Sequence, residues 1–337
     1  MKHPKITIVI PLYNVESYIA ECLQSVMRQT YQGPIECILV DDCSTDNSVV
    51  VAKKMIAEYE GTVAFSMLNH EKNMGVSCAR NSGVDAASGD YVFFLDSDDV
   101  ITDDCIEVLT SFSGNYDVIV GNYEYLEDRS EGRIKMKNRC FTGEQYVMEY
   151  LNDRSVNPEV WNKLFSLRYL KDNNLKFVPD VLQFEDTLFT FNFTCFPTRL
   201  CFVNVVTYYY RSERAGSFVY QLLNDNKLRL DALSRFWLEA SRRCDRKSYK
   251  KVQEKFLQDK AYYIFVLAFE FGREVEMPLY KCYYGFRREY PFKPMRLWLS
   301  GEESSHWYKT RLIWSLPPLL GCCWLYMQMV KRKMKKN

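Results

Sequence analysis

The sequence predicts an α/β protein with a mostly parallel sheet flanked by helices, followed by a helical C-terminal region. Short apolar, β-branched segments alternate with segments of helical periodicity through the first hundred residues, in the order β-α-β-α-β-α-β. The connections between them are short, which is typical of parallel strands joined by crossover helices. The chain has 337 residues, enough for a full α/β domain and a second, smaller unit.

Each element of this pattern has its own signal. The strands are expected at residues 5–10, 35–40, 63–68 and 91–95, with a later strand at 117–125 closing the sheet edge. Helices are expected from Val15 to Met27, from about residue 47 to 59 and from 75 to 87. Pro11 is expected to end the first strand, and Asn14 to cap the first helix. Thr142 is expected to cap a later helix.

Polar side chains gather where the predicted strands end. Tyr13 and Asn14 follow the first strand, Asp41 and Asp42 follow the second, and an acidic cluster follows the fourth. In open parallel sheets, ligands bind beyond the carboxyl ends of the strands. The sequence therefore predicts a ligand site at this edge.

The acidic cluster is the run Asp96-Ser97-Asp98-Asp99, directly after a buried strand. Carboxylates this close raise one another's pKa, so a bound cation would stabilise them. Oxygen ligands alone suit Mg²⁺ or Mn²⁺, which indicates a metal–diphosphate site. The alternative is a capping loop, with Asp98 or Asp99 beginning a helix over residues 102–112. A calcium loop is excluded because Ile101 stands where that loop needs glycine.

Other classes of protein are disfavoured. A net charge of +1 gives no general attraction to nucleic acid. No GxGxxG follows a strand and no GxxxxGK[ST] is present, which excludes a Rossmann dehydrogenase and a P-loop kinase. Only three histidines occur, and His70 falls in an expected loop, so a catalytic histidine is not predicted. Twelve cysteines without a CxxC pair, and no signal peptide, favour a reducing cytosolic compartment.

Seven motifs together resemble the family 2 glycosyltransferases of the GT-A fold. Four cover the first 110 residues in order, at residues 6–14, 38–48, 73–83 and 91–99. Three more resemble the second half of bacterial capsule and lipopolysaccharide members, at residues 161–165, 184–189 and 208–211. The resemblance implies transfer of a sugar from a nucleoside diphosphate donor.

The resemblance also implies a donor site. Pro11, Tyr13 and Asp42 would cradle the nucleotide base, because a carboxylate can accept the imide N–H of uracil and a tyrosine ring can stack on it. Arg80 would reach the base or the diphosphate, the alternative being a solvated helix face.

Within the acidic cluster, the resemblance makes Asp98 the direct ligand of Mn²⁺ or Mg²⁺. Asp96 would hold the ribose or a metal-bound water. The metal would bridge the two phosphates and stabilise the departing nucleoside diphosphate. Asp99 is left open between a sugar contact and a helix cap.

For the acceptor, the resemblance implies a carboxylate base in the Glu185-Asp186 pair. Asp186 is predicted to take the proton of the attacking hydroxyl, with Glu185 assisting or orienting the acceptor. The alternative is an N-capping pair for a helix over residues 187–193. Weaker candidates for the acceptor or phosphate side are Trp161, Lys163 and Arg211. For Trp161 the alternative is core packing, and for Arg211 it is an ion pair with Glu213.

The predicted organisation is a GT-A domain over residues 1–215, in which residues 1–112 bind the nucleotide and residues 113–215 bind the acceptor. A helical region follows over 216–310, then an apolar and basic tail over 311–337. Residues 312–330 carry no charge, but prolines interrupt them and six mostly basic residues follow. This favours peripheral contact with a membrane surface; the alternative is a helix docked on the domain.

The predicted function is metal-dependent, inverting transfer of a sugar to a saccharide or lipid-linked oligosaccharide of a surface polysaccharide, and a UDP-sugar is the expected donor. The predicted location is the cytoplasmic face of the cell membrane. No Gln-x-x-Arg-Trp motif occurs, so one sugar per encounter is expected. A nucleotidyltransferase is disfavoured because residues 10–14 hold no glycine-rich basic loop. The remaining alternative is a catalytically silent homologue used for binding or assembly.

Overall fold

A computed structural model describes residues 3–128, 137–143, 145, 146, 149, 156–179, 181, 184–194 and 196–212. These residues belong to one compact unit, which comprises residues 1–150 and 154–215. The predicted helical region 216–310 and the tail 311–337 lie outside the described residues. No helix within the described ranges is long and apolar enough to cross a membrane.

The first four strands form a parallel sheet, as the sequence predicts, and the structure gives their order as β3-β2-β1-β4. They are β1 (Ile6–Leu12), β2 (Ile35–Asp41), β3 (Ala64–Asn69) and β4 (Tyr91–Phe94). Because all four run the same way, their carboxyl ends meet at one edge of the sheet. This edge carries the polar residues that the sequence singles out.

The sheet continues beyond β4 with strands of both directions. These are β8 (Lys163–Ser166), β6 (Val118–Tyr125), β9 (Arg199–Tyr210), β5 (Val100–Ile101) and β7 (Arg139–Thr142). β8 is antiparallel to both β4 and β6, while β9 is parallel to β6 and antiparallel to β5 and β7. The parallel prediction therefore holds for the first half, and the sheet as a whole is mixed. The prediction that residues 117–125 close the edge is wrong, because β6 lies between β8 and β9.

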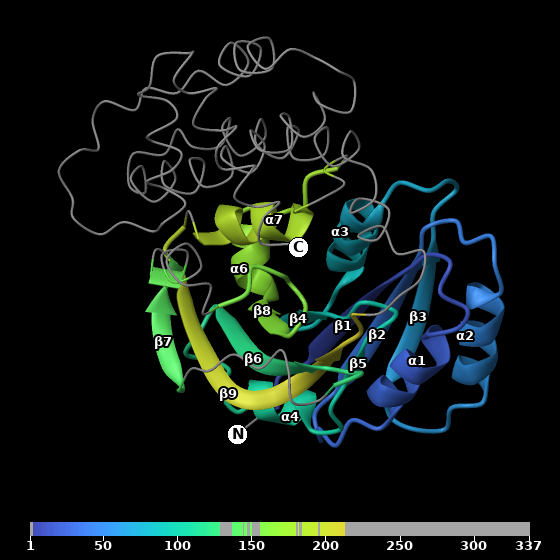
Figure 1. Cartoon of the computed structure of the whole chain (residues 1–337), viewed down its shortest axis with the longest axis horizontal. Helices are drawn as coiled ribbons and strands as arrows, with labels where there is room; N and C mark the ends of the chain where they lie inside the picture. Colours follow the sequence, from blue (N-terminus) through green and yellow to red (C-terminus); the bar gives the residue numbers. More distant parts are fainter. Residues whose placement is uncertain are drawn as a thin grey trace, which may run out of the picture. The chain divides into compact units, whose positions relative to one another are not determined.

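Helices cover both faces of the sheet (Figure 1). On one face lie α1 (Ile19–Met27), α2 (Ser48–Ala57) and α4 (Cys105–Thr110), and on the other lie α3 (Val76–Ala86), α6 (Leu167–Asp172) and α7 (Glu185–Thr194). The first helix is shorter than predicted, because residues 16–18 form a turn before it.

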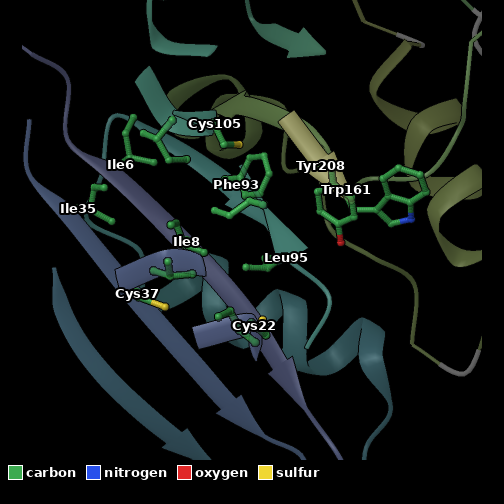
Figure 2. Packing of buried hydrophobic residues seen from close by; sticks show 14 of the residues in the cluster. Ile6, Ile8, Cys22, Ile35, Cys37, Phe93, Leu95, Cys105, Trp161 and Tyr208 are labelled. Carbon is green, nitrogen blue, oxygen red and sulfur yellow. The ribbon is translucent and has the colours of Figure 1, made fainter. Parts of the chain in front are cut away.

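The alternation of side chains along each strand divides the core between these two layers. Ile6, Ile8 and Ile10 of β1 pack with Cys22 of α1 and Phe93 of β4, as Figure 2 shows for the residues it labels. On the opposite face, Ile38 and Val40 of β2 pack with Ala79 of α3. β1, β2 and β4 are thus buried on both faces, which explains their nearly continuous apolar sequences, whereas β3 is partly exposed.

Two local predictions at the end of β1 are wrong. Pro11 does not end the strand: it lies opposite Val40 in the parallel register, and β1 continues to Leu12. Asn14 does not cap α1, whose N-cap position is Tyr18. Instead Asn14 has a left-handed φ of 50°, and its Oδ1 accepts a hydrogen bond from the Thr45 backbone at 2.8 Å. Its amide thus joins two loops at the ligand edge.

The capping alternative for the acidic cluster is also wrong. Residues 100 and 101 form β5, and the N-cap position of α4 is Asp104, not Asp98 or Asp99. The predicted cap at Thr142 is confirmed, since its hydroxyl accepts from the Gln145 backbone at 3.3 Å and Gln145 Oε1 accepts from the Thr142 backbone at 2.9 Å.

Candidate active site

Asp42 organises the loop that follows β3. Its carboxylate is 3% exposed and accepts hydrogen bonds from the backbone N–H groups of Met74 at 2.8 Å and Gly75 at 2.7 Å. Gly75 has a φ of 86°, a conformation that favours glycine, and it immediately precedes α3. Asp42 therefore links the end of β2 to the start of α3, at the place where a nucleotide base is predicted to bind.

His70 is a partner of Asp42 that the sequence reasoning missed. Its Nδ1 lies 2.7 Å from Asp42 Oδ1, and its Nε2 lies 2.9 Å from Ser82 Oγ on α3. The ring therefore joins the exits of β2 and β3 to α3. A signal was available, because His70 directly follows β3 and so stands at the same sheet edge as Asp42.

Exposed apolar side chains border Asp42. Tyr13 is 43% exposed and Met74 is 42% exposed. Tyr13 is close to Asp42 because the Asp42 backbone donates to the Leu12 carbonyl at 2.9 Å. Pro11 is different, since it is buried within β1. An exposed ring and an exposed thioether are side chains on which a planar base can stack, and both belong to segments joined to Asp42 by backbone hydrogen bonds.

The acidic cluster divides into exposed and buried members. Asp96 and Asp98 are partly exposed, whereas Asp99 is 1% exposed. Asp99 accepts from the Tyr208 hydroxyl at 2.6 Å and from the Arg211 backbone at 2.7 Å. The Asp99 carboxylate therefore anchors the end of β9 and caps no helix, and its contact with the sugar stays a prediction.

The charges of this cluster are consistent with a bound cation. Burial, followed by the charges of Asp98 and Asp96, raises the pKa of Asp99 well above its usual range. The described residues contain no group of three or more His, Cys, Asp or Glu side chains arranged to hold a metal. Two carboxylates completed by substrate phosphates are a usual set of ligands for Mg²⁺. Asp98 and Asp96 match that set in chemical type, and both are partly exposed.

Arg80 brings the two halves of the site together. It lies on α3, is 2% exposed, and donates from Nη2 to Asp96 Oδ1 at 2.8 Å. Its Nη1 donates to Asp186 Oδ1 at 2.5 Å and to Glu185 Oε1 at 3.1 Å. The alternative of a solvated helix face is therefore wrong for Arg80. The Phe177 ring lies 5.3 Å from the guanidinium carbon and covers it.

Glu185 and Asp186 differ in how strongly Arg80 holds them. Burial and the charge of Asp186 raise the pKa of Glu185 to about 8, although Arg80 opposes this. Burial also raises the pKa of Asp186, and again Arg80 acts in the opposite direction. Because Arg80 is closer to Asp186 than to Glu185, it favours the ionised form of Asp186 more strongly. The pair thus suits one protonated acid beside one carboxylate.

Both residues begin α7, but the contacts of Asp186 lead away from that helix. Besides Arg80, its other carboxylate oxygen lies 3.5 Å from the Val160 backbone nitrogen. The side chain therefore faces α3 and the segment before β8.

The weaker candidates lie in different surroundings. Trp161 is 5% exposed and stacks on Tyr208 and Tyr210 with ring centroids 4.9 and 5.2 Å away. Arg211 donates to the Asp98 carbonyl at 2.8 Å and pairs with Glu21 at 2.6 Å; Glu213, its suggested partner, lies outside the described residues. Arg211 thus contacts the acidic cluster directly, whereas Trp161 packs in the hydrophobic core, as its alternative predicts.

Lys163 is fully buried. Its ammonium donates to Asn157 Oδ1 at 3.0 Å, to Asn162 Oδ1 at 3.1 Å and to the Glu159 carbonyl at 2.5 Å. Burial lowers its pKa to about 7. These contacts support the loop before β8; a contact with acceptor or phosphate stays a prediction for Lys163.

The parallel strands, their flanking helices and the carboxylates at one sheet edge define an α/β fold of the GT-A type. The chain belongs to glycosyl transferase family 2, whose profile matches residues 7–175. Glycosyltransferase GlyG of Streptococcus pneumoniae is 30% identical over 225 residues, which cover 64% of this chain and 72% of GlyG. Poly(ribitol-phosphate) beta-N-acetylglucosaminyltransferase TarS of Staphylococcus aureus is 28% identical over 216 residues, covering 63% of this chain and 36% of TarS.

Solved structures share the fold. TarS 1–349 of S. aureus in complex with UDP-GlcNAc gives a TM-score of 0.64 at 21% identity, covering 85% of this chain and 81% of that one. Mannosyltransferase PcManGT from Pyrobaculum calidifontis, in complex with GDP-Man and Mn²⁺, gives 0.57 at 17% identity, covering 100% of this chain and 89% of that one. Family and fold agree, and the chain is a glycosyltransferase of GT-A fold.

Proposed function

We propose that this glycosyltransferase moves a sugar from a UDP-linked donor to a hydroxyl of a saccharide in surface polysaccharide synthesis, with inversion at the anomeric carbon. The observation that carries the proposal is the convergence of Asp96 with Glu185 and Asp186 around Arg80. It brings the predicted donor side and the predicted base to one place. The UDP-GlcNAc complex of the structural neighbour TarS supports the nucleotide.

In the proposed reaction, Asp42 and Tyr13 hold the base, and the diphosphate lies toward Asp96 and Asp98. A divalent ion held by Asp98 and Asp96 would neutralise the charge of the departing diphosphate. Asp186 orients the acceptor hydroxyl and takes its proton as the oxygen bonds to the anomeric carbon. The bond from that carbon to the diphosphate breaks on the opposite side, and UDP leaves.

The acceptor would be a saccharide, free or lipid-linked, presented at the cytoplasmic face of the membrane. Contact with the membrane surface would come from the tail, residues 311–337. Both statements rest on the sequence and on the polymers named for relatives, among them the poly(ribitol-phosphate) of TarS.

The test combines donor binding with transfer. UDP- and GDP-sugars are offered with Mn²⁺, Mg²⁺ or EDTA to the wild type and to Asp98→Asn, Asp186→Asn and Asp103→Asn. Asp98→Asn should lose metal-dependent donor binding, measured as thermal stabilisation worth about 2.7 kcal/mol at a hundredfold excess over Kd. Asp186→Asn should keep binding and lose about 10²- to 10⁴-fold in transfer.

Asp103→Asn is the matched control, because that nearby carboxylate is exposed and pairs with Arg28, outside the predicted site. It should behave as wild type. Binding without transfer by wild type, for every donor and acceptor offered, would favour the silent homologue. No binding of any nucleotide would contradict the donor site itself.

A further inference from the structure

The two terminal nitrogens of the Arg80 guanidinium donate hydrogen bonds to two different segments of the chain. Nη2 reaches Asp96, which follows β4, and Nη1 reaches Asp186 and Glu185, which begin α7. The fork of arginine is planar and rigid, so it fixes the relative places of the carboxylates that it joins. Arg80 therefore couples the donor side of the site to the predicted base.

The surroundings hold this fork in one orientation. The guanidinium is almost completely buried, and the Phe177 ring lies over it at 5.3 Å. Its Nε–H has no hydrogen-bond partner among the described residues. A buried donor left unpaired costs free energy, so the contacts of the two Nη groups outweigh that loss. The guanidinium is therefore oriented so that both Nη groups bond carboxylates, although this leaves its Nε–H without a partner among the described residues.

We propose that Arg80 is a positioning residue for sugar transfer, which holds the Asp186 carboxylate at a set place relative to the donor-side Asp96. The inference rests on the proposed function, since it assigns the geometry of that same site. Without Arg80, the alignment of Asp186 with the donor would depend on the packing of α7 and on the 3.5 Å contact with the Val160 backbone. A base misplaced by about 1 Å can lose roughly 10²-fold in rate.

The proposal predicts a separate effect on the pH dependence of transfer. The charged groups that face Asp186 are Arg80 from α3, Asp96 after β4, its neighbour Glu185 and Lys163 from β8. Arg80 lowers the pKa of Asp186 against the effect of burial. Without the guanidinium, the base would be ionised only at higher pH.

The test compares Arg80→Lys and Arg80→Gln with a control on the same helix, Asp85→Asn. Asp85 pairs with Lys176 at 2.8 Å, and both side chains are at least half exposed, so the pair links α3 to the same segment that carries Phe177 but lies outside the site. The measurements are kcat and its pH profile, donor Kd by calorimetry, and melting temperature.

We expect Arg80→Gln to lose about 10²-fold in kcat, a larger loss than its loss of donor affinity. The acid limb of its pH profile should move to higher pH, because the guanidinium no longer lowers the pKa of Asp186. Arg80→Lys should fall clearly below wild type, because an ammonium group cannot span two carboxylates in the same way. Asp85→Asn should match wild type in all of these measurements.

Wild-type kcat and an unshifted acid limb in Arg80→Gln would overturn the inference while leaving the proposed function intact. Full activity of Arg80→Lys would overturn the bridging role, since charge alone would then suffice. Should Arg80→Gln fail to fold, Arg80→Lys decides between these results. Absence of transfer by wild type would overturn the proposed function, and the inference with it.

Discussion

Buried charge is the main feature of this protein at the scale of single residues. Asp96, Glu185 and Asp186 share one guanidinium, and the side chains of Glu185 and Asp186 are only 16% and 14% exposed. One cation cannot fully compensate three carboxylates in a poorly hydrated site. The raised pKa of Glu185 relieves this excess of negative charge by keeping a proton on the pair.

The first prediction concerns stability and pH. The pKa of Glu185 is about 8 in the folded protein and 4.5 in the unfolded reference, so folding binds a proton between these values. The contribution of Glu185 to the free energy of unfolding is therefore largest below pH 4.5 and is lost as the pH rises through about 8. Glu185→Gln mimics the protonated acid, so its stability relative to wild type should increase by about 1 kcal/mol or more from pH 5 to pH 8.

Urea unfolding at several pH values checks this prediction, with Glu36→Gln as the control. Burial opposes ionisation of Glu36, but Lys5, Ser88 and Thr7 lower its pKa to about 2. Glu36 is then ionised in both states above pH 5, and the stability difference of Glu36→Gln should stay constant there. A constant difference for Glu185→Gln as well would contradict the proton assigned to Glu185.

At the scale of elements, the close approach of α3 to the sheet decides where the site lies. A Cβ at Gly83 would come within 2.3 Å of Val9 Cγ1 on β1. Only a residue without a side chain lets α3 approach β1 this closely. The close approach brings Arg80, on the same helix, to the edge where β4 ends. The glycine of the motif at residues 73–83 thus has a packing role.

The second prediction follows from this contact. Gly83→Ala should lower the free energy of unfolding by about 1–3 kcal/mol through overpacking, although alanine favours helix. Val9→Ala should be destabilising in the wild type because it removes buried methyl groups. In the double variant the total cost should be smaller than the sum of the two single costs, since the smaller side chain makes room for the new methyl group.

Chemical denaturation of the four proteins completes this cycle. Simple additivity of the two changes would show that Gly83 and Val9 do not constrain each other. An increase in stability for Gly83→Ala alone would contradict the close contact directly.

At the scale of the whole molecule, the sheet joins two regions with different predicted tasks. The donor side comes from the segments after β1, β2 and β4, whereas the predicted base stands at the start of α7. β9 connects the strands of the second region, because it pairs with β6, β5 and β7. Its end also returns to the donor side, where Tyr208 donates to Asp99.

The third prediction tests the proposed boundary after residue 215. A fragment of residues 1–215 should unfold cooperatively and bind the donor nucleotide, because every predicted donor residue and all nine strands of the described sheet lie within it. The matched control ends at residue 198 and lacks β9. It should not fold, because β6, β5 and β7 would each lose a hydrogen-bonded neighbour.

Circular dichroism melts and calorimetric titration with UDP distinguish these results. A folded fragment that no longer binds UDP would place some of the donor site beyond residue 215. An unfolded 1–215 fragment beside a soluble full chain would contradict the boundary.

Much of the first half was predictable because its determinants are local. The alternation of short apolar strands with helical stripes predicts that β1 to β4 run parallel, and the motifs point to Asp42, Asp96, Asp98 and the Glu185-Asp186 pair. The predictions were wrong where the local preference of a residue was overridden by its contacts with a distant segment. Pro11 lies within β1 because β2 supplies its register, and Asn14 bridges two loops instead of capping α1.

The sequence by itself determined the α/β class, the family and the residue types at the edge of the sheet, since these depend on periodicity and on motifs within short segments. Only the tertiary structure decided the contacts between those segments. It placed β6 inside the sheet, set His70 against Asp42, buried Lys163 and gave Arg80 its three carboxylates. These outcomes depend on side chains that are far apart in the chain and adjacent only after folding, so no local pattern records them.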